Sequence, residues 1–123
     1  MTGLLDTSIV LGPADDALPD QAAISVVTLA EMRLGVLVAR TAADRAARLE
    51  RLVEIERVFA AIPVDDEVAA SYATIVAAER ERGRRPRAMD ALIAATALAK
   101  GMTLFTRDRE LANLTTVKVR LVR

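Results

Sequence analysis

The sequence predicts an α/β fold: a doubly wound, three-layer α/β/α sandwich around a central parallel sheet of about five strands. Two observations predict it. Short apolar runs rich in β-branched residues alternate with longer helical runs along the whole chain. The 123 residues contain no repeat, no low-complexity tract and no linker long enough to divide domains. We therefore expect one domain over residues 1–123, long enough to bury a sizeable core.

The first half of the chain supplies three of the expected strands. Residues 3–6 (GLLD) predict a short strand, and residues 22–28 (AAISVVT) predict a second, which is apolar on both faces like a parallel strand covered on both sides. Two helical runs follow, at 29–40 and 41–60. Residues 60–64 (AAIPV) predict a third, short strand.

The second half repeats the alternation. Its first helix is expected to stop at Gly83, because glycine commonly follows a helix C-terminus. Pro86 opens the next helix, over residues 87–101. Residues 102–106 (MTLFT) and 116–122 (TVKVRLV) predict the last two strands, which completes a parallel sheet.

Composition narrows the possible chemistry. The chain has neither cysteine nor histidine, which excludes thiolate metal sites, a Ser-His-Asp arrangement and most zinc sites. Carboxylates are left as the abundant reactive groups, and oxygen-only ligation favours magnesium or manganese. The formal net charge is zero, so any binding of nucleic acid must rest on a local patch.

Nothing in the sequence predicts a membrane location. The longest uncharged apolar runs, such as residues 91–99, are far shorter than the roughly 20 residues that a membrane helix needs. The N-terminus enters the first strand without a basic region or a cleavage site. We expect a soluble cytoplasmic protein.

Four acids fall where doubly wound sheets bind ligands, beyond the carboxyl ends of the strands. Asp6 ends the first strand, and Asp108 follows the fourth. Glu31 lies in the helix after the second strand, and Asp90 lies in the first turn of the helix that feeds the fourth. These residues are the candidate catalytic and metal-binding groups.

Each acid also has an ordinary structural explanation. Thr28 and Glu31 match the capping box T-x-x-E. Asp90 suits a first helical turn because of the helix dipole, and Asp6 and Asp108 can each cap the segment that follows. Taken singly, none of these residues is evidence of chemistry.

A further pair of acids, Asp65 and Asp66, follows the third strand. In this topology a third strand usually lies at the sheet edge, away from the point where the strand order reverses. We therefore exclude this pair from the site.

Three blocks of sequence, in their order, resemble a known family. They are LLDTSIVL, ISVVTLAEMRLGV and RPRAMDALIAATALAKGMTLFTRD. Over nearly the whole chain they are similar to the PIN-domain ribonucleases, specifically the VapC-type toxins of type II toxin-antitoxin systems. The resemblance implies a PIN domain-like fold and a metal-dependent endoribonuclease that hydrolyses phosphodiester bonds of structured RNA such as transfer RNA.

The resemblance also implies roles for single residues. The matching positions of an acidic pocket that binds magnesium, or manganese in its place, are Asp6, Glu31, Asp90 and Asp108, with the supporting hydroxyls of Ser8 and Thr106. Two carboxylates about 4 Å apart repel by roughly 4 kcal/mol at an effective dielectric of 20, so converging acids need protons or a cation. A bound ion would acidify the attacking water. The number of ions stays open.

Two features depart from the family pattern. Residues 12–21 (GPADDALPDQ) are short and hold two prolines, so any helix there must be small, which would alter substrate access. After Asp108 the family often shows an acid followed by Phe, whereas Glu110 is followed by Leu111 here. Glu110 is either an auxiliary acid of the metal site or part of a helical turn.

Arginines near the acids are candidates for contact with phosphates. A cluster precedes Asp90, and its members are Arg80, Arg82, Arg84, Arg85 and Arg87. Of these, Arg87 is the candidate for contact with substrate or antitoxin, together with Arg107 and Arg109 beside Asp108. The alternative is an ordinary solvated helix end, because glutamates are interleaved with the cluster.

The resemblance implies two protein partners: a second copy of the chain, giving a homodimer, and a VapB-type antitoxin. Helix 41–60 carries an apolar stripe of Leu49, Leu52, Val53 and Ile55. This stripe is either one side of the core or part of a surface that receives the antitoxin.

Two other functions remain open. One is a phosphotransfer domain with Asp6 as a covalent nucleophile, similar to the haloacid dehalogenases, but that pattern wants a second Asp where this chain has Ser8. It also wants a later lysine, for which only Lys100 and Lys118 exist. The other is a catalytically inactive PIN-fold scaffold, against which the presence of all four acids argues.

Overall fold

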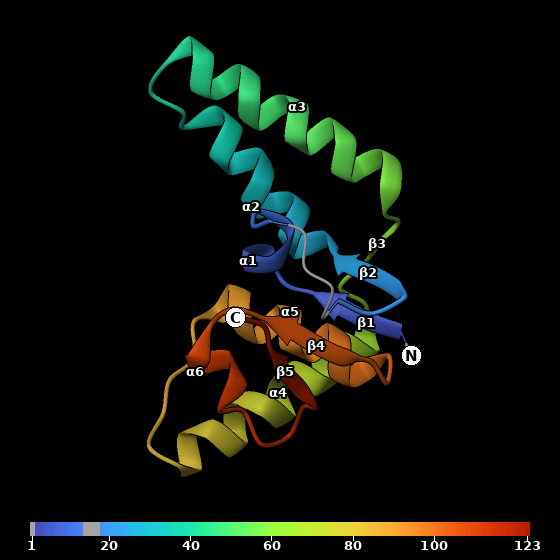
Figure 1. Cartoon of the computed structure of the whole chain (residues 1–123). Helices are drawn as coiled ribbons and strands as arrows, with labels where there is room; N and C mark the ends of the chain where they lie inside the picture. Colours follow the sequence, from blue (N-terminus) through green and yellow to red (C-terminus); the bar gives the residue numbers. More distant parts are fainter. Residues whose placement is uncertain (1, 14–17) are drawn as a thin grey trace.

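Five parallel strands form the sheet of this computed structural model, which describes residues 2–13 and 18–123. Their order is β3-β2-β1-β4-β5, and every neighbouring pair is parallel. The strands are β1 (Thr2–Leu5), β2 (Gln21–Ser25), β3 (Ala61–Ile62), β4 (Thr103–Thr106) and β5 (Val119–Leu121). Helices cover both faces, which confirms the predicted three-layer α/β/α sandwich (Figure 1).

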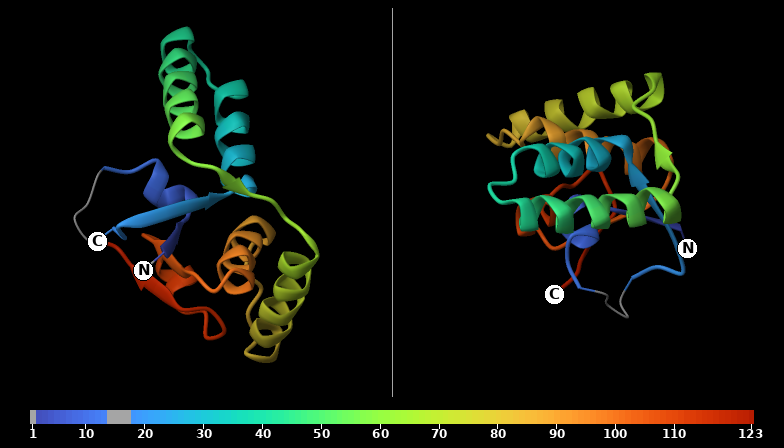
Figure 2. Two further views of the ribbon diagram at one scale, coloured as in Figure 1. Left: turned by 90° about the vertical axis from the view of Figure 1, so that its right-hand side faces the viewer. Right: turned by 90° about the horizontal axis from the view of Figure 1, so that it is seen from above.

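The helices lie between the strands along the chain. They are α1 (Thr7–Val10), α2 (Val26–Leu37), α3 (Ala42–Val58), α4 (Asp66–Glu81), α5 (Ala88–Ala99) and α6 (Arg109–Ala112). Helices α4 and α5 pack against each other on one side of the sheet, and α2 and α3 form a hairpin that projects from the other side (Figures 1 and 2). Within the residues described, no helix has both the length and the apolar character that spanning a bilayer requires.

The strands alternate their side chains between two cores. Leu4 and Leu104 face the core under α4 and α5, whereas Leu5 and Phe105 face the core under α1 and α3. All of these residues are at most 5% exposed, as expected for a central strand pair covered on both faces. Gly3 makes room for one of them, because a Cβ atom there would lie 2.6 Å from Cε1 of Phe105.

The prediction of a strand over residues 22–28 is wrong at its end. Strand β2 stops at Ser25, whose hydroxyl accepts a hydrogen bond of 3.0 Å from the Val27 amide and so caps α2. The β-branched run that follows looks strand-like, but the cap and the burial of Val27 and Thr28 hold it in a helix. The capping-box interpretation of Thr28 and Glu31 is therefore wrong, since both residues lie inside α2.

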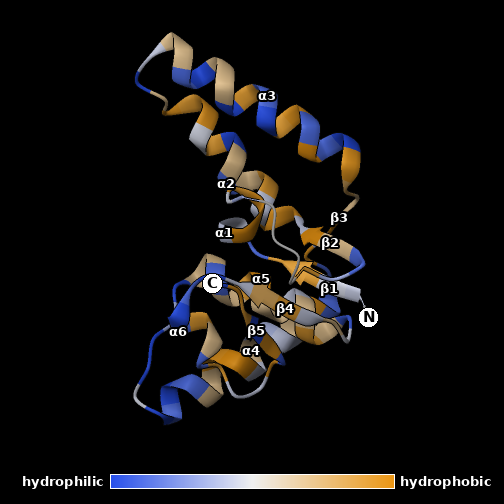
Figure 3. Ribbon diagram, viewed as in Figure 1, coloured by the Kyte–Doolittle hydropathy of each residue, from blue (hydrophilic) through white to orange (hydrophobic). Residues whose placement is uncertain are grey.

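Two other sequence features have mixed outcomes. The predicted helix stop at Gly83 is confirmed, with a φ of 75° just after α4. The apolar stripe of helix 41–60 divides: Leu52 and Ile55 are buried, whereas Leu49 and Val53 are 48% and 47% exposed. In the hydropathy colouring, hydrophobic and hydrophilic residues alternate along α3 (Figure 3). Of the proline-containing segment 12–21, residues 14–17 lie outside the described part of the chain.

Candidate acidic site and adjoining cavity

The strand order brings the candidate acids to one edge of the sheet. Strand β1 lies between β2 and β4, so the residues that follow these three strands meet at their common carboxyl edge. Asp6 follows β1 directly, Asp108 follows β4, and Glu31 lies in α2, which follows β2. Asp65 follows β3 at the edge of the sheet, as the sequence predicted for the excluded pair.

Asp6 is 3% exposed and is held by a dense set of hydrogen bonds. Its Oδ1 accepts from the Ser8 hydroxyl at 2.6 Å and from the Ile9 amide at 3.1 Å, the latter as the N-cap of α1. Its Oδ2 accepts a short hydrogen bond from the Thr106 hydroxyl. Both oxygens of Asp6 are thus oriented by contacts within the fold.

The supporting hydroxyls link β1 to β4. The Ser8 hydroxyl accepts from the Arg107 amide at 3.0 Å, and the Thr106 hydroxyl accepts from the Asp108 amide at 2.9 Å. Asp108 in turn caps α6, because its Oδ1 accepts from the Glu110 amide at 2.8 Å. The capping explanations of Asp6 and Asp108 therefore hold, and both caps stand at the same edge.

Glu31 joins this edge through two threonines. The Thr7 hydroxyl donates to Oε1 of Glu31 at 2.6 Å and lies 3.1 Å from the hydroxyl of Thr28, which is fully buried. From the sequence, Thr28 was interpreted only as a capping residue and Thr7 was not singled out. The available signal was that Thr28 lies three residues before Glu31, so the two share one face of a helix.

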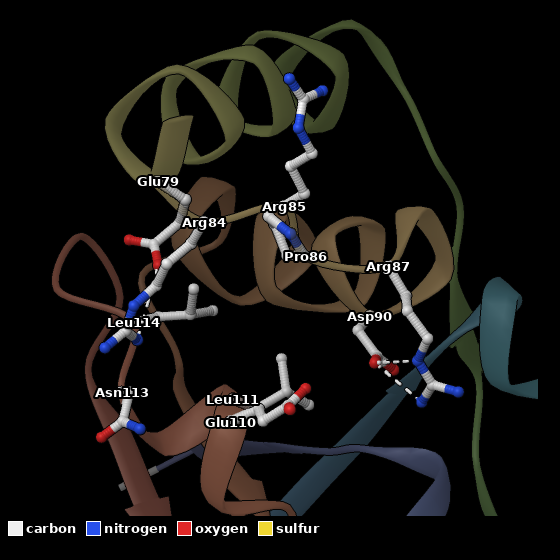
Figure 4. A pocket seen from close by; sticks show the side chains of 10 residues that line it. All are labelled: Glu79, Arg84, Arg85, Pro86, Arg87, Asp90, Glu110, Leu111, Asn113 and Leu114. Carbon is white, nitrogen blue, oxygen red and sulfur yellow. Dashed lines mark hydrogen bonds and ion pairs between the residues drawn. The ribbon is translucent and has the colours of Figure 1, made fainter. Parts of the chain in front are cut away.

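Asp90 reaches the same edge from α5 and forms an ion pair with Arg87. Nε and Nη2 of Arg87 both lie 2.9 Å from Oδ2 of Asp90 (Figure 4). The pKa of Arg87 is raised above its ordinary value, first by the hydrogen bond to Asp90, then by the charge of Asp90, and further by the charges of Asp108 and Glu31. Three acids from three elements thus act on one guanidinium.

The donors suit a hard divalent cation, since they are carboxylates and hydroxyls without nitrogen or sulfur ligands. Arg87 already supplies positive charge among Asp90, Asp108 and Glu31. Across residues 2–13 and 18–123, however, no group of three or more acidic side chains stands close enough to hold one ion. An ion would therefore require Arg87 to leave Asp90 and the acidic side chains to turn toward one another.

The remaining predicted arginines differ in their availability. Arg107 donates from Nη1 to the carbonyl of Arg123 at 3.2 Å and from Nη2 to that of Pro13 at 3.1 Å, so its guanidinium ties two segments of the fold. Arg109 is exposed in the first position of α6. Contact of Arg107 or Arg109 with a substrate or antitoxin stays a prediction.

A cavity of about 410 Å³ adjoins Asp90. It lies between the C-terminal end of α4, the start of α5 and α6 (Figure 4). Its lining residues are Glu79, Arg84, Arg85, Pro86, Arg87, Asp90, Glu110, Leu111, Asn113 and Leu114. Glu110 lies in the helical turn α6, which agrees with one of the two interpretations of this residue. It also lines this cavity.

Comparison with known proteins identifies the class. The model of the PIN domain family matches residues 4–116, which is most of the chain. The chain therefore belongs to the PIN-domain family, as its sequence indicated.

Individual relatives narrow the identification to the VapC type. Ribonuclease VapC5 of Mycobacterium tuberculosis is 40% identical over 121 residues, covering 91% of this chain and 87% of the relative. Toxin FitB of Neisseria gonorrhoeae is 33% identical over 120 residues, covering 85% and 86%. These relationships make the chain a VapC-type member of the PIN-domain family.

Solved structures agree with this relationship. The structure of VapBC-5, a toxin-antitoxin system of M. tuberculosis, contains a chain with 38% identity and a TM-score of 0.89, with 98% of each chain covered. The structure of FitAcB from N. gonorrhoeae contains one with 34% identity and a TM-score of 0.79, with 97% of this chain and 96% of that one covered.

Proposed function

We propose that this protein is a metal-dependent endoribonuclease toxin of the VapC type. The observation that carries the proposal is geometric: the strand order places Asp6, Asp108 and Glu31 at one sheet edge, and the charges of Asp108 and Glu31 also act on the Arg87 that pairs with Asp90. Buried Asp6 is connected to the same edge through Thr106. The relatives named ribonucleases support the activity, and the RNA substrate is inferred from them.

Magnesium is the proposed cofactor, with manganese as its substitute. Asp6, Glu31, Asp90 and Asp108 would hold the ion, because they are the four acids that this edge combines. A bound divalent ion supplies an acidified water and neutralises charge on a phosphodiester under attack. The chain's own part is to bring the four carboxylates to one sheet edge and to restrain their orientation there.

The hydroxyls perform this orientation. Ser8 and Thr106 each donate to one oxygen of Asp6 and fix the plane of its carboxylate. Thr7 restrains Glu31 in the same way. Such partners of ligating carboxylates commonly contribute about 10- to 100-fold in metal affinity or activity. Arg87 offsets part of the negative charge of the acids while no ion is bound, and its 77% exposed side chain can swing outward.

We further propose that the chain forms a homodimer and binds a VapB-type antitoxin. The solved structures of relatives include VapBC and FitAB pairs, which supports such a partner. The tip of the α2–α3 hairpin offers a surface for it, because Leu34, Leu37 and Val38 are 59%, 76% and 60% exposed. The double variant Leu34→Glu, Leu37→Glu tests this surface by co-purification with a VapB-type antitoxin. Undiminished co-purification would exclude the surface as the binding site. Val58→Glu, at the other end of α3, is the matched control.

RNA cleavage in cells tests the activity directly. The unmodified chain and Asp90→Asn are expressed in parallel, and new RNA 5′ ends are mapped across the transcriptome. We expect cut sites that depend on Asp90, and their positions identify the target class. Identical end maps would favour the alternative of an inactive PIN-fold scaffold, whose acids only cap helices, as Asp6 and Asp108 do here.

A further inference from the structure

The cavity beside Asp90 extends well beyond the acidic site. Its volume of about 410 Å³ lies within the roughly 300–1,000 Å³ range of small-ligand sites. Asp90 and Arg87 stand at one end, and Arg84 and Asn113 stand at the other (Figure 4). The proposed metal site involves only the end at Asp90. The end at Arg84 and Asn113 therefore has no role in that site.

Arg84 follows the C-terminal end of α4, whose backbone is held by two hydrogen bonds. Gly83 adopts a φ of 75°, which favours glycine, and its amide donates to the Arg80 carbonyl at 3.0 Å. The Arg84 amide then turns back to the Glu79 carbonyl at 2.8 Å. This pair of bonds is the Schellman arrangement, which determines where the backbone of Arg84 stands.

The opposite wall is attached to the same helix end by Arg82. Nη1 of Arg82 lies 2.8 Å from Oε2 of Glu79, whose carboxylate is almost fully buried. The same nitrogen donates to the carbonyl of Asn113 at 3.1 Å. Arg82 therefore holds α4 against α6 and supplies the main charge partner of Glu79, so the cavity is a built feature of the fold.

Arg84 is left with unused donors. Its closest acidic contact is Nη1 to Oε1 of Glu79 at 3.9 Å, beyond hydrogen-bond distance. Its side chain is 44% exposed and makes no hydrogen bond within the part of the chain that the structure describes. Arg85, a second arginine of the lining, extends away from the cavity, and the third, Arg87, is paired with Asp90 (Figure 4). Arg84 is thus the guanidinium available to an incoming anion.

The lining combines this cation with an apolar surface. Leu111 and Leu114, from α6 and the turn after it, face Pro86 across the cavity. A guanidinium binds a phosphate with paired donors. Apolar side chains can pack against the flat face of an unstacked nucleobase. Asn113 adds an amide that can donate to and accept from the edge of a base.

We propose that this cavity binds one nucleotide of the RNA strand, next to the bond cut at the acidic site. Arg84 contacts the phosphate of that nucleotide, and the wall of Leu111, Leu114 and Pro86 contacts its base. The subsite rests on the proposed ribonuclease function and deepens it, because it makes cleavage depend on the nucleotide beside the scissile bond.

Binding of a single-stranded RNA oligonucleotide in an Asp6→Asn background tests the subsite without cleavage. Asp6 does not line the cavity, so this background leaves it intact. We expect Arg84→Gln to weaken RNA binding about tenfold, the effect of losing one charge-assisted hydrogen bond. The slope of log affinity against log salt concentration falls by about 0.7, as for one phosphate contact on a single strand. Arg84→Lys retains most of that slope because it retains the charge.

Two further variants separate the subsite from general charge effects. Arg80→Gln removes an exposed arginine of α4 that does not line the cavity, and it leaves RNA affinity near the parental value. Asn113→Ala, in the active background, changes which base stands beside the cut in the mapped 5′ ends. Thermal melting of each variant verifies folding.

The outcomes distinguish the subsite from the activity. If the parental chain cuts RNA in an Asp6-dependent manner but Arg84→Gln changes neither affinity, salt slope nor cut-site choice, the subsite proposal is overturned and the ribonuclease stands. If Arg84→Gln weakens only the capture of an antitoxin, the cavity receives a protein segment and the proposal is likewise overturned. If the parental chain does not cut RNA, both proposals fail.

Discussion

The carboxyl ends of β1 and β3 carry two aspartates with the same local structure and different surroundings. Asp6 and Asp65 each follow a strand and each cap a helix, accepting a backbone hydrogen bond three residues on. Asp6 is 3% exposed between β2 and β4, whereas the Asp65 side chain is 43% exposed at the sheet edge. Asp65 has its own cation, with Nζ of Lys100 at 2.8 Å from its Oδ2.

The comparison teaches that position in the strand order, not the capping role, separates a candidate catalytic acid from a structural one. At a central strand the ends of the neighbouring strands bring further acids close, and the nearest cation is the shared Arg87. At the edge strand Nζ of Lys100 lies 2.8 Å from Asp65 and 4.0 Å from Glu67, so a local lysine offsets the charge of the acid that caps the helix. Asp65 therefore has a nearby lysine, whereas the acids at the centre share Arg87.

The largest expected effect is that of Asp6→Asn. We expect it to lower RNA cleavage by about 10²-fold or more, because even the outer partners of metal ligands contribute about 10- to 100-fold. It should also abolish the rise in Tm on adding magnesium, measured by thermal melting. Asp65→Asn is the matched control, since it caps a helix equally but leaves cleavage and the magnesium response unchanged. Equal losses in both variants would break the comparison.

Thr7→Val tests whether the hydroxyls at the central edge orient the acids. The substitution keeps the side-chain shape but removes the 2.6 Å hydrogen bond to Glu31. We expect about a tenfold loss of cleavage at limiting magnesium, with partial recovery at high magnesium. Thr74→Val is the control, because Thr74 is an exposed threonine whose hydroxyl donates only to a helix carbonyl. Cleavage unaffected by Thr7→Val would remove Thr7 from the site.

Arg87→Met tests the shared cation. Because Arg87 and an ion compete for Asp90, its removal should lower the apparent Kd for magnesium, by up to about fivefold for an exposed pair. The Tm without magnesium falls at low salt, since the acids then repel one another. Titration calorimetry and melting measure the two effects. Arg87→Lys keeps the charge and should resemble the parent. Unchanged magnesium affinity in Arg87→Met would show that the arginine does not compete.

The smallest effect is expected for the ion pair of Asp65 and Lys100 at the sheet edge. The hydrogen bond from Lys100 lowers the pKa of Asp65 below its ordinary value of 3.8, with help from the Val68 amide. The folded state thus binds fewer protons there than the unfolded state, so the stabilisation is present above about pH 3.8 and is lost as the pH falls through the folded-state pKa. Asp65→Asn should destabilise the chain at pH 7 and converge with the parent in strong acid.

The ion pair of Asp65 and Lys100 also predicts a change of stability at alkaline pH. The hydrogen bond to Asp65 raises the pKa of Lys100 above its ordinary value of 10.5, so its contribution is present below that pH and is lost as the pH rises through the higher folded-state value. Urea unfolding at several pH values measures both windows. Asp66→Asn, a neighbour in the first turn of α4, is the control. A difference between Asp65→Asn and the parent that did not vary with pH would contradict the pairing.

Much of the fold was predictable because the hydrophobic pattern and the helix signals are local. The alternation of apolar strands with helices, the stop at Gly83 and the edge position of the third strand all agree with the structure. The end of β2 was not predictable, because Val26 and Val27 favour strands by themselves. Only the Ser25 cap and the core contacts of Val27 turn them into a helix.

The sequence by itself determined the kinds of groups available: oxygen donors without histidine or cysteine, and three blocks typical of a PIN domain. The tertiary structure alone decided which of these groups meet. Thr7 joins Glu31 across 24 positions and Thr106 joins Asp6 across 100, and Arg82 attaches α4 to the turn after α6. The physical reason is that propensity and capping act within a few residues, whereas the charge around a site is set by strand order, which only the folded sheet establishes.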